Sequence, residues 1–370
     1  MTRELYIGLM SGTSADAIDS VLVDFSEGKI NLINSFSKKI PTELKKQILD
    51  YKDLTSVNIQ NLSSLEHDLS ELFAVCVNKI LVNSEIKPKE IIAIGSHGQT
   101  IWHAPQIDKP YTIQLGDPNI ISSRTGIRTV SDFRRMDIAN NGEGAPLAPL
   151  FHKRFFGRNK KNIAVVNIGG ISNISFLDGE NDQDLGFDIG PGNCLMDLWI
   201  RENTNKDYDD NGELAKSGKV NQDLINIFLK DNFFNRSPPK STGTDYFNID
   251  WLNRKLSLLE KKESIKNIQA SLLALTSITI SNAFKELKKI DEIFLCGGGV
   301  NNNYLVEDLK KMLPEKISST EKVGLNPDFL EAICFAWLAK KRIEKKYHDL
   351  TGITGNRNKI LLGNICEPPR

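Results

Sequence analysis

The sequence predicts an α/β protein made of two similar domains. Each half of the chain reads as three extended segments followed by helices that alternate with strands, so the second half repeats the plan of the first. The chain has 370 residues, whereas a single hydrophobic core stops growing at about 250–300 residues. Strands that alternate with helices favour a buried sheet, and paired domains of this kind usually bind ligands in the crevice between them.

In the first half, short apolar runs bounded by glycine-containing turns predict the strands. The expected strands are 4–10, 17–25, 30–36, 91–94 and 127–131. Apolar residues from Val57 to Ile80 keep a helical spacing and predict one long helix, and a second helix is expected near 116–124. We therefore assign residues 1–133 to an N-terminal domain.

The second half shows the same succession of elements. The expected strands are 163–168, 171–177, 185–188, 292–296 and 316–319. The expected helices are 193–203, 265–289, one after 300, and 327–343. The stretch 204–250 is rich in Asn, Asp and Lys and reads as small helices and loops inserted into a C-terminal domain of residues 134–345. The last segment, about 346–370, is expected to pack back on the N-terminal domain.

The composition excludes several classes of function. The 47 basic residues balance 47 acidic ones, so no net charge attracts the chain to nucleic acid or to an anionic membrane. The five cysteines are scattered and form no CxxC pair, which argues against a disulfide framework or a structural zinc site. We see no export signal and no apolar run of the about 18 residues that span a bilayer. A cytoplasmic protein without nucleic-acid or membrane partners is expected.

Glycine-rich turns are the first candidates for ligand binding. Ser11-Gly12-Thr13-Ser14 lies between two predicted strands, and Gly169-Gly170 lies at the equivalent place in the second half. Glycine lets the backbone approach a phosphate, whose oxygens accept hydrogen bonds from nearby amides and hydroxyls. Either turn alone could be a hairpin, but the repetition favours a phosphate site. A third cluster, Gly297-Gly298-Gly299, fits an anion site at a helix N-terminus or a tight turn, and it lacks the Lys-Ser/Thr of a Walker A loop.

Polar side chains at the ends of predicted strands are the candidates for chemistry. Asp188 ends an apolar strand and could act as a general base, or it could form an Asx turn or a cap for the helix that starts near Asn193. The sequence leaves these roles open. His97 and Gln99 also follow a buried strand. A single histidine at such a place more often makes only structural hydrogen bonds within a loop.

Two further charged residues occupy comparable places. Arg134 follows the last predicted strand of the first half and could hold a carboxylate or phosphate through two hydrogen bonds, although Asp132 is an alternative structural partner. Glu331 opens an apolar helix, where the helix dipole also favours an acid in the first turn.

Motifs spread along the chain carry a resemblance to a known family. They are 7–14, 95–100 with 102–103, 131–135, 144–147, 167–173, 188–193, 240–243, 296–299, 331–332 with 335–339, 354–355 and 362–363. Together they closely resemble the anhydro-N-acetylmuramic acid kinase family, a member of the actin/Hsp70/sugar-kinase superfamily. The resemblance implies two duplicated ribonuclease-H-like (actin-like ATPase) domains around a central cleft for ATP and sugar.

The resemblance also implies an activity and its residues. The family uses ATP and Mg²⁺ to phosphorylate 1,6-anhydro-N-acetylmuramic acid, with hydrolytic opening of the anhydro ring. It implies ATP contacts at Gly12, Thr13, Ser14, Ala15, Asp16, Ala17, Ile18, Asp19, Gly169, Gly170, Gly297, Gly298 and Gly299. It implies Asp188 as the catalytic base, and as sugar contacts His97, Gln99, Arg134 and Glu331. Asp16 and Asp19 are the candidates to hold the metal.

Other functions fit the same residues less well. A kinase for another small sugar would share the ATP site. A non-catalytic ATP-binding module would be expected to lack the base, whereas Asp188 is present. The chain departs from the family pattern at Ala15, Ala17, Glu143, Ile189 and Thr244-Asp245. The expected partner is a small sugar, and a homodimer is a further expectation.

Overall fold

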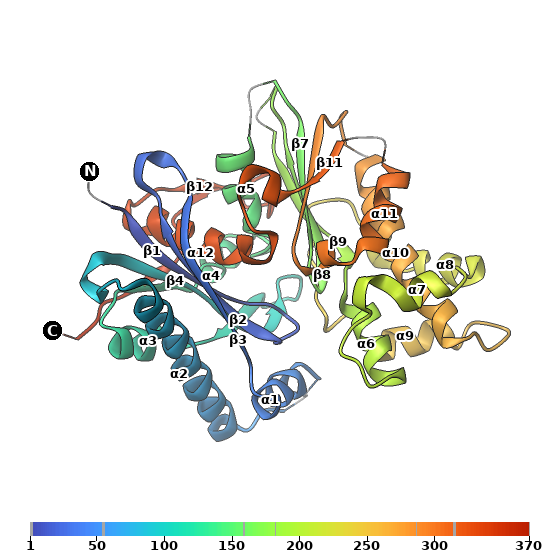
Figure 1. Cartoon of the computed structure of the whole chain (residues 1–370), viewed down its shortest axis with the longest axis horizontal. Coiled ribbons are helices and arrows are strands. Elements are labelled where there is room, and N and C mark those ends of the chain that lie inside the picture. Colours follow the sequence, from blue (N-terminus) through green and yellow to red (C-terminus); the bar gives the residue numbers. More distant parts are fainter. Residues whose placement is uncertain are drawn as a thin grey trace. The chain divides into compact units, whose positions relative to one another are not determined.

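The computed structural model describes residues 3–53, 56–157, 160–181, 183–285, 287–313 and 316–369. The chain forms two units (Figure 1). Unit 1 consists of Met1–Phe151 with Phe329–Arg370, and unit 2 consists of His152–Asp328. The boundaries thus fall at 151 and 328, whereas the sequence analysis placed them at 133 and 345. The helix expected at 327–343, which we had assigned to the second domain, packs on the sheet of unit 1.

Unit 1 contains a mixed sheet with the strand order β14-β6-β4-β1-β2-β3, and β5 pairs with β4. The strands are β1 (Leu5–Ser11), β2 (Ala17–Asp24), β3 (Asn31–Lys39), β4 (Ile91–Ala104), β5 (Tyr111–Leu115), β6 (Thr129–Ser131) and β14 (Asn364–Cys366). A separate short hairpin pairs β12 (His348–Asp349) with β13 (Lys359–Ile360). Because β14 pairs antiparallel with β6, the end of the chain returns to this unit.

Helices cover both faces of this sheet. They are α1 (Thr42–Asp53), α2 (Ile59–Ser84), α3 (Pro118–Thr125), α4 (Arg135–Ala139) and α12 (Leu330–Ile343), while the boundary between the two units falls within α5 (Ala148–Phe156). Side chains alternate along β1, so Leu5, Ile7 and Leu9 join a core with Leu69 and Phe73 of α2. Gly8, between them in sequence, faces α12 on the opposite side.

Close backbone packing seats α12 on the sheet. Gly8 of β1 and Gly95 of β4 are neighbours in the parallel register of the two strands. A Cβ atom at Gly8 would overlap the carbonyl oxygen of Ala332, and one at Gly95 would overlap that of Phe335. The two glycines therefore leave the room in which the helix backbone lies directly against the strands.

Unit 2 contains a sheet with the strand order β11-β10-β7-β8-β9. Its strands are β7 (Ile163–Ile168), β8 (Ile171–Leu177), β9 (Leu185–Pro191), β10 (Glu292–Cys296) and β11 (Lys316–Ser319). In both units the first three strands are antiparallel neighbours, and the first pairs in parallel with the fourth. The fourth strand in turn pairs in parallel with a later strand, β4 with β6 in unit 1 and β10 with β11 in unit 2. The predicted duplication of an α/β domain is confirmed.

The helices of unit 2 surround a single apolar cluster. They are α6 (Cys194–Asn203), α7 (Glu213–Ser217), α8 (Gln222–Leu229), α9 (Ile249–Leu256), α10 (Ile265–Lys285) and α11 (Asn303–Met312). Buried side chains of α10, such as Leu272 and Leu275, pack with Val166 of β7 and Phe228 of α8. As expected, the polar insertion 204–250 folds into short helices and loops.

Several predicted bounds were wrong in informative ways. The strand expected at 91–94 continues to Ala104, so His97 and Gln99 lie on a buried strand rather than in a loop. The strand expected at 185–188 continues to Pro191, so Asp188 lies inside it. The helix expected at 265–289 ends at Lys285, and residue 286 lies outside the described residues.

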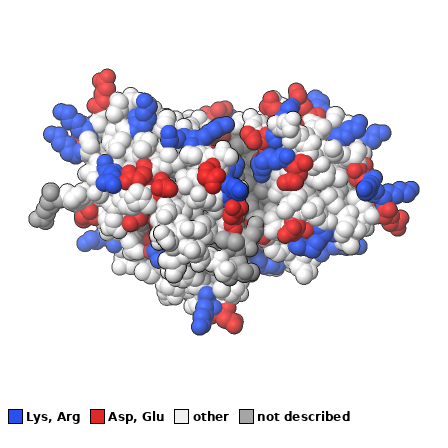
Figure 2. All heavy atoms as spheres, turned by 90° about the horizontal axis from the view of Figure 1, so that it is seen from below, with Lys and Arg blue, Asp and Glu red and all other residues white. Residues whose placement is uncertain are grey.

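The surface carries interspersed charge. On the face that Figure 2 shows, basic and acidic side chains lie side by side and neither sign gathers into a broad field. Among the helices of the described residues, none is long and apolar enough to cross a membrane.

We expect Gly8→Ala to destabilise unit 1 strongly. The new methyl group would overlap a helix carbonyl, and overpacking a core typically costs about 1–3 kcal/mol even where side chains can move. Gly12→Ala is the matched control, because a Cβ atom there meets no atom within 4 Å. Thermal unfolding should show a clearly lower midpoint for Gly8→Ala only. Equal midpoints would contradict the close approach of α12.

Candidate active site

The turn between β1 and β2 leaves free space beside the backbone of Gly12. The Ala15 N–H donates to the Gly12 carbonyl oxygen at 3.0 Å, which closes a turn over Thr13 and Ser14. Ala15 is fully buried and adopts a left-handed conformation with φ of 52°. No atom lies within 4 Å of the place that a Cβ at Gly12 would take. Internal packing therefore does not require glycine at this position, whereas the approach of a phosphate group to the backbone would.

Gln99 of β4 holds this turn in place. It lies beside Ser11 in the register of the two strands and is fully buried. The Ser11 hydroxyl donates to Gln99 Oε1 at 2.6 Å, and Gln99 Nε2 donates to the carbonyl oxygens of Gly12 and Thr100, each at 3.2 Å. These bonds occupy the amide hydrogens of Gln99, so the side chain anchors the Gly12 turn.

His97 and Arg134 form a hydrogen-bonded pair. His97 Nδ1 lies 2.9 Å from the Gly98 carbonyl oxygen, which fixes the hydrogen on Nδ1. His97 Nε2 is then an acceptor, and Arg134 Nε and Nη2 lie 3.1 and 2.9 Å from it. Burial lowers the pKa of His97 well below its usual value, and the adjacent Arg134 lowers this pKa further. His97 is thus neutral and orients the guanidinium.

Glu331, in the first turn of α12, interacts electrostatically with the same arginine. Burial raises the pKa of Glu331, the Arg134 charge lowers it, and the Asp19 charge raises it. One helical turn later, Phe335 packs its ring against His97 with a centroid distance of 4.7 Å. Unit 1 therefore pairs His97 with Arg134, and Glu331 lies on the helix that packs against His97. The family resemblance proposed all three as sugar contacts.

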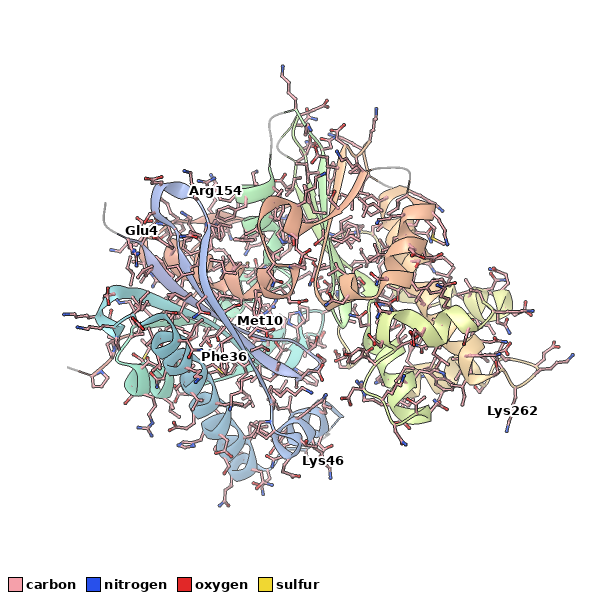
Figure 3. All side chains as sticks on the ribbon, viewed as in Figure 1. Glu4, Met10, Phe36, Lys46, Arg154 and Lys262 are labelled. Carbon is pink, nitrogen blue, oxygen red and sulfur yellow. The ribbon has the colours of Figure 1, made fainter. Side chains whose placement is uncertain are left out.

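The two metal candidates have different surroundings. Asp16 is exposed and forms an ion pair with Lys45 of α1. Asp19 lies on β2 opposite Met10, which is labelled in Figure 3 and is almost fully buried. Among the described residues, no group of three or more His, Cys, Asp or Glu could hold a metal by itself. Mg²⁺ commonly takes one or two carboxylates together with substrate phosphates, so Asp19 fits that donor set.

The equivalent turn of unit 2 is tied to the segment after β9. The Gly169 carbonyl oxygen accepts from the Asn193 N–H at 2.8 Å, and the Gly170 carbonyl oxygen accepts from the Gly192 N–H at 2.9 Å and the Cys194 N–H at 3.1 Å. The nearest atom to a Cβ at Gly169 would lie at 3.5 Å, an ordinary contact. As at Gly12, packing does not require the glycine.

The glycines after β10 divide into two kinds. A Cβ at Gly297, whose φ is +81°, would overlap the Asn167 side chain, and a Cβ at Gly299 would overlap Ile168. Gly298, in contrast, has no atom within 4 Å of that place. Gly297 and Gly299 therefore serve the close packing of this turn against β7, while Gly298 leaves an open backbone surface.

Asp188 lies in the interior of β9, where hydrogen bonds fix both its backbone and its side chain. It is 7% exposed. A register shift opposite Ser172 and Asn173 places a β-bulge beside it, and bulges commonly redirect a side chain near active sites. The Asp188 N–H donates to the Lys240 carbonyl oxygen at 3.0 Å, and its Oδ2 accepts from the Thr242 N–H at 3.0 Å. The segment 240–242 thus orients the carboxylate.

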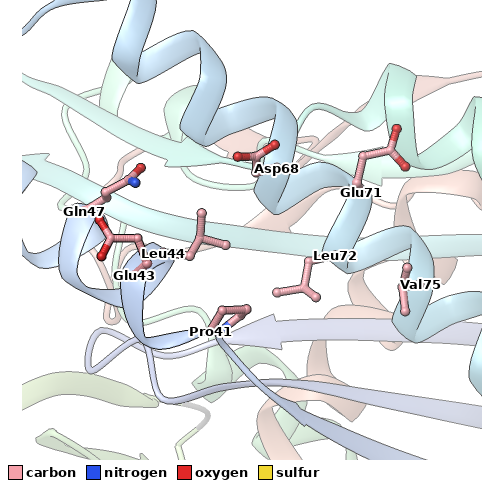
Figure 4. A pocket seen from close by; sticks show the side chains of 8 residues that line it. All are labelled: Pro41, Glu43, Leu44, Gln47, Asp68, Glu71, Leu72 and Val75. Atoms are coloured by element: carbon pink, nitrogen blue, oxygen red, sulfur yellow. The ribbon is translucent and has the colours of Figure 1, made fainter.

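Sequence reasoning noted the string 240–243 but gave it no role. Its contact with Asp188 spans 54 residues, so no local pattern connects the two. A pocket of about 420 Å³ between α1 and α2, shown in Figure 4, is a separate feature. Among the described residues that line it, such as Leu44, Leu72 and Val75, none is a predicted site residue.

Comparisons with known proteins agree with the motifs. The family model described as "Anhydro-N-acetylmuramic acid kinase" matches residues 4–368. Proteins named anhydro-N-acetylmuramic acid kinase are similar over nearly the full length of both chains. One from Coxiella burnetii (strain Dugway 5J108-111) is 44% identical over 99% of this chain and 98% of its own length. One from Pasteurella multocida (strain Pm70) is 42% identical over 97% of this chain and 96% of its own.

Solved structures are similar at much lower identity. The activator of the 2-hydroxyisocaproyl-CoA dehydratase from Clostridium difficile, solved with bound ADPNP, is 11% identical and has a TM-score of 0.46. The similarity covers 93% of this chain and 98% of that one.

We expect the His97 ring to stay neutral over the physiological range. Burial and the Arg134 charge both oppose its protonation, so its pKa lies well below 6.5. Its NMR signal, identified by its loss in His97→Gln, should not titrate between pH 8 and pH 5.5. An inflection near pH 6.5 would contradict the proposed pairing with Arg134.

Proposed function

Because this chain belongs to the anhydro-N-acetylmuramic acid kinase family, we propose that it transfers the γ-phosphoryl group of ATP to 1,6-anhydro-N-acetylmuramic acid while water opens the anhydro ring. The product would be N-acetylmuramic acid 6-phosphate, an intermediate in the recycling of peptidoglycan. The observation that carries this proposal is the buried carboxylate of Asp188, whose orientation the Thr242 N–H fixes at 3.0 Å.

The phosphates of ATP would bind at the glycine turns. Support comes from Gly12 and Gly298, which have no atom within 4 Å of a potential Cβ, and from Gly169, whose nearest atom would lie at 3.5 Å. The carbonyl oxygens of Gly12 and Gly169 each accept a hydrogen bond from a residue of the same unit. These bonds fix the orientation of the peptide groups to which the two oxygens belong. Rigid turns of this kind suit a phosphate, because their geometry is set before the ligand arrives.

Mg²⁺ would be held by Asp19, and Asp16 would join only if its ion pair with Lys45 opened. When bound, the ion would offset the negative charge of the transferring phosphoryl group. The family departure at Ala17 lies at the start of β2, and it leaves Asp19 in its place on the same strand.

The sugar would contact Arg134 and Glu331 directly. Arg134 offers a charged donor to an oxygen of the sugar or its carboxylate, and Glu331 offers an acceptor to a hydroxyl group. His97 would hold the guanidinium through its Nε2, and Gln99 would hold the Gly12 turn. We thus assign His97 and Gln99 to positioning rather than to direct catalysis.

Asp188 would act as the general base. It takes a proton from water as the water oxygen forms a bond to C1 of the sugar, and the bond between C1 and O6 breaks. O6 then forms the new bond to the γ-phosphorus, and ADP leaves. The cysteines of the described residues are all free thiols, which fits the cytoplasmic location that we also propose.

We expect Asp188→Asn to fold and bind ATP and sugar but to form product at least about 10²-fold more slowly. The Asn amide oxygen can still accept from Thr242, whereas an amide cannot take a proton from water. Mass analysis of the product after incubation with ATP, Mg²⁺ and the anhydro sugar gives the rate.

Asp184→Asn is the matched control for this experiment. The same substitution is made just before β9, where the carboxylate pairs with Lys153 at 2.6 Å. It should form product at nearly the normal rate. Full activity in Asp188→Asn would overturn the role of this carboxylate, and no sugar phosphate from the unaltered protein would overturn the proposed function.

A further inference from the structure

Asp137, in the short helix α4, has a completely buried carboxylate. Its Oδ2 accepts from the Gly144 N–H at 2.7 Å. Its Oδ1 accepts from the Thr354 hydroxyl at 2.8 Å and from Asn356 Nδ2 at 3.0 Å. Burying a carboxylate is costly unless donors replace its water, so these bonds are what allow Asp137 to remain there.

The chain around this carboxylate is wrapped closely. The Gly142 N–H donates to the Asp137 carbonyl oxygen at 2.9 Å, and the Glu143 N–H donates to the Thr354 carbonyl oxygen at 2.8 Å. A Cβ at Gly142 would overlap the Asp137 carboxylate, and Gly144 has a φ of +70° that favours glycine. The segment 142–144 is therefore shaped around Asp137.

The same segment reaches the candidate site through one residue, Gly144. Gly144 donates its N–H to Asp137, and its carbonyl oxygen accepts from Arg134 Nη1 at 2.8 Å. The other edge of the guanidinium donates to His97. Arg134 is thus held between His97 and a carbonyl group whose own position depends on Asp137.

We propose that Asp137 is a positioning residue for the phosphorylation of the sugar, acting through Gly144 on Arg134. The inference rests on the proposed function, in which Arg134 contacts the sugar. An arginine side chain loses rotamer freedom when it is ordered. Fixing it before the sugar arrives removes that cost from binding, and a misplacement of about 1 Å can reduce a rate by 10²-fold.

This role also accounts for two motifs that the ATP and sugar sites do not use. One is the string that begins at Gly144, and the other is the string that begins at Thr354. Asp137 and Thr354 lie 217 residues apart in sequence and meet at this carboxylate. The C-terminal segment therefore contributes to the sugar site without supplying a contact to the sugar.

A double-mutant cycle tests the inference. Asp137→Asn replaces one acceptor oxygen by an amide NH2 group. Depending on the orientation of the amide, either the Gly144 N–H or both the Thr354 hydroxyl and the Asn356 side-chain amide lose their acceptor. We expect kcat/KM for the sugar to fall about 10-fold, which corresponds to about 1.4 kcal/mol, while KM for ATP stays unchanged. In an Arg134→Ala background the same change should have almost no further effect, because the two residues act in series.

Asp209→Asn is the matched control. This buried carboxylate likewise accepts from backbone N–H groups, those of Leu214 and Ala215, and from the side-chain amide of Gln269, but it lies in unit 2. We expect it to lower the thermal midpoint without changing kcat/KM for the sugar. If Asp137→Asn does not fold, Thr354→Val takes its place in the cycle, and Thr354→Ser, which keeps the hydroxyl group, should restore the activity.

The outcomes separate the inference from the proposed function. If Arg134→Ala leaves kcat/KM for the sugar unchanged, the proposed sugar contact is wrong and the inference is overturned with it. If Arg134→Ala lowers this value but the Asp137→Asn effect adds fully to it, only the inference is overturned. An Asp137→Asn variant that loses stability but keeps its sugar kinetics, as Asp209→Asn should, would also overturn the inference alone.

Discussion

The proposed sugar contacts of unit 1 depend on how closely α12 approaches the sheet. Gly8 and Gly95 lie side by side in β1 and β4, and the carbonyl oxygens of Ala332 and Phe335 occupy the space that side chains would fill. This contact fixes the distance of α12 from the sheet and its position along the strands. Glu331 directly precedes Ala332, so the same contact determines where its carboxylate lies. The histidine two residues beyond Gly95 packs against Phe335, so the contact also sets the pair that orients Arg134.

The two units share one strand order but use it differently. Unit 1 places polar side chains on its long parallel strand β4, whereas unit 2 places Asp188 on its third strand, β9. In each unit, carbonyl oxygens of the turn between the first two strands accept hydrogen bonds from other residues of that unit. Gln99 does this for Gly12, and the backbone after β9 does it for Gly169 and Gly170. Duplication thus supplies two rigid turns of a kind that suits phosphates, and divergence supplies the proposed base and the proposed sugar contacts.

Periodicity predicted most strands and the duplication, because buried strands and amphipathic helices leave local patterns. It could not predict which sheet α12 covers, since the apolar face of a helix can pack on the apolar face of either sheet. Gly8 and Gly95 were the available signal, because glycine inside a strand often marks close backbone approach. The strand predicted at 91–94 was shorter than β4 because glycine is typical of turns, although Gly95 and Gly98 both lie within the strand. Asp137 left no signal, because two of its three side-chain partners, Thr354 and Asn356, lie 217 and 219 residues away in sequence.

The origin of the oxygen on C1 of the product tests the central claim most directly. If Asp188 activates water against C1 and O6 becomes the nucleophile for phosphorus, reaction in ¹⁸O-water should place the label on C1 of the sugar 6-phosphate. The phosphate group should carry none, because its bridging oxygen comes from the sugar and its other oxygens come from ATP. Label found only in phosphate would mean that water attacks ATP instead, and this result would contradict the account.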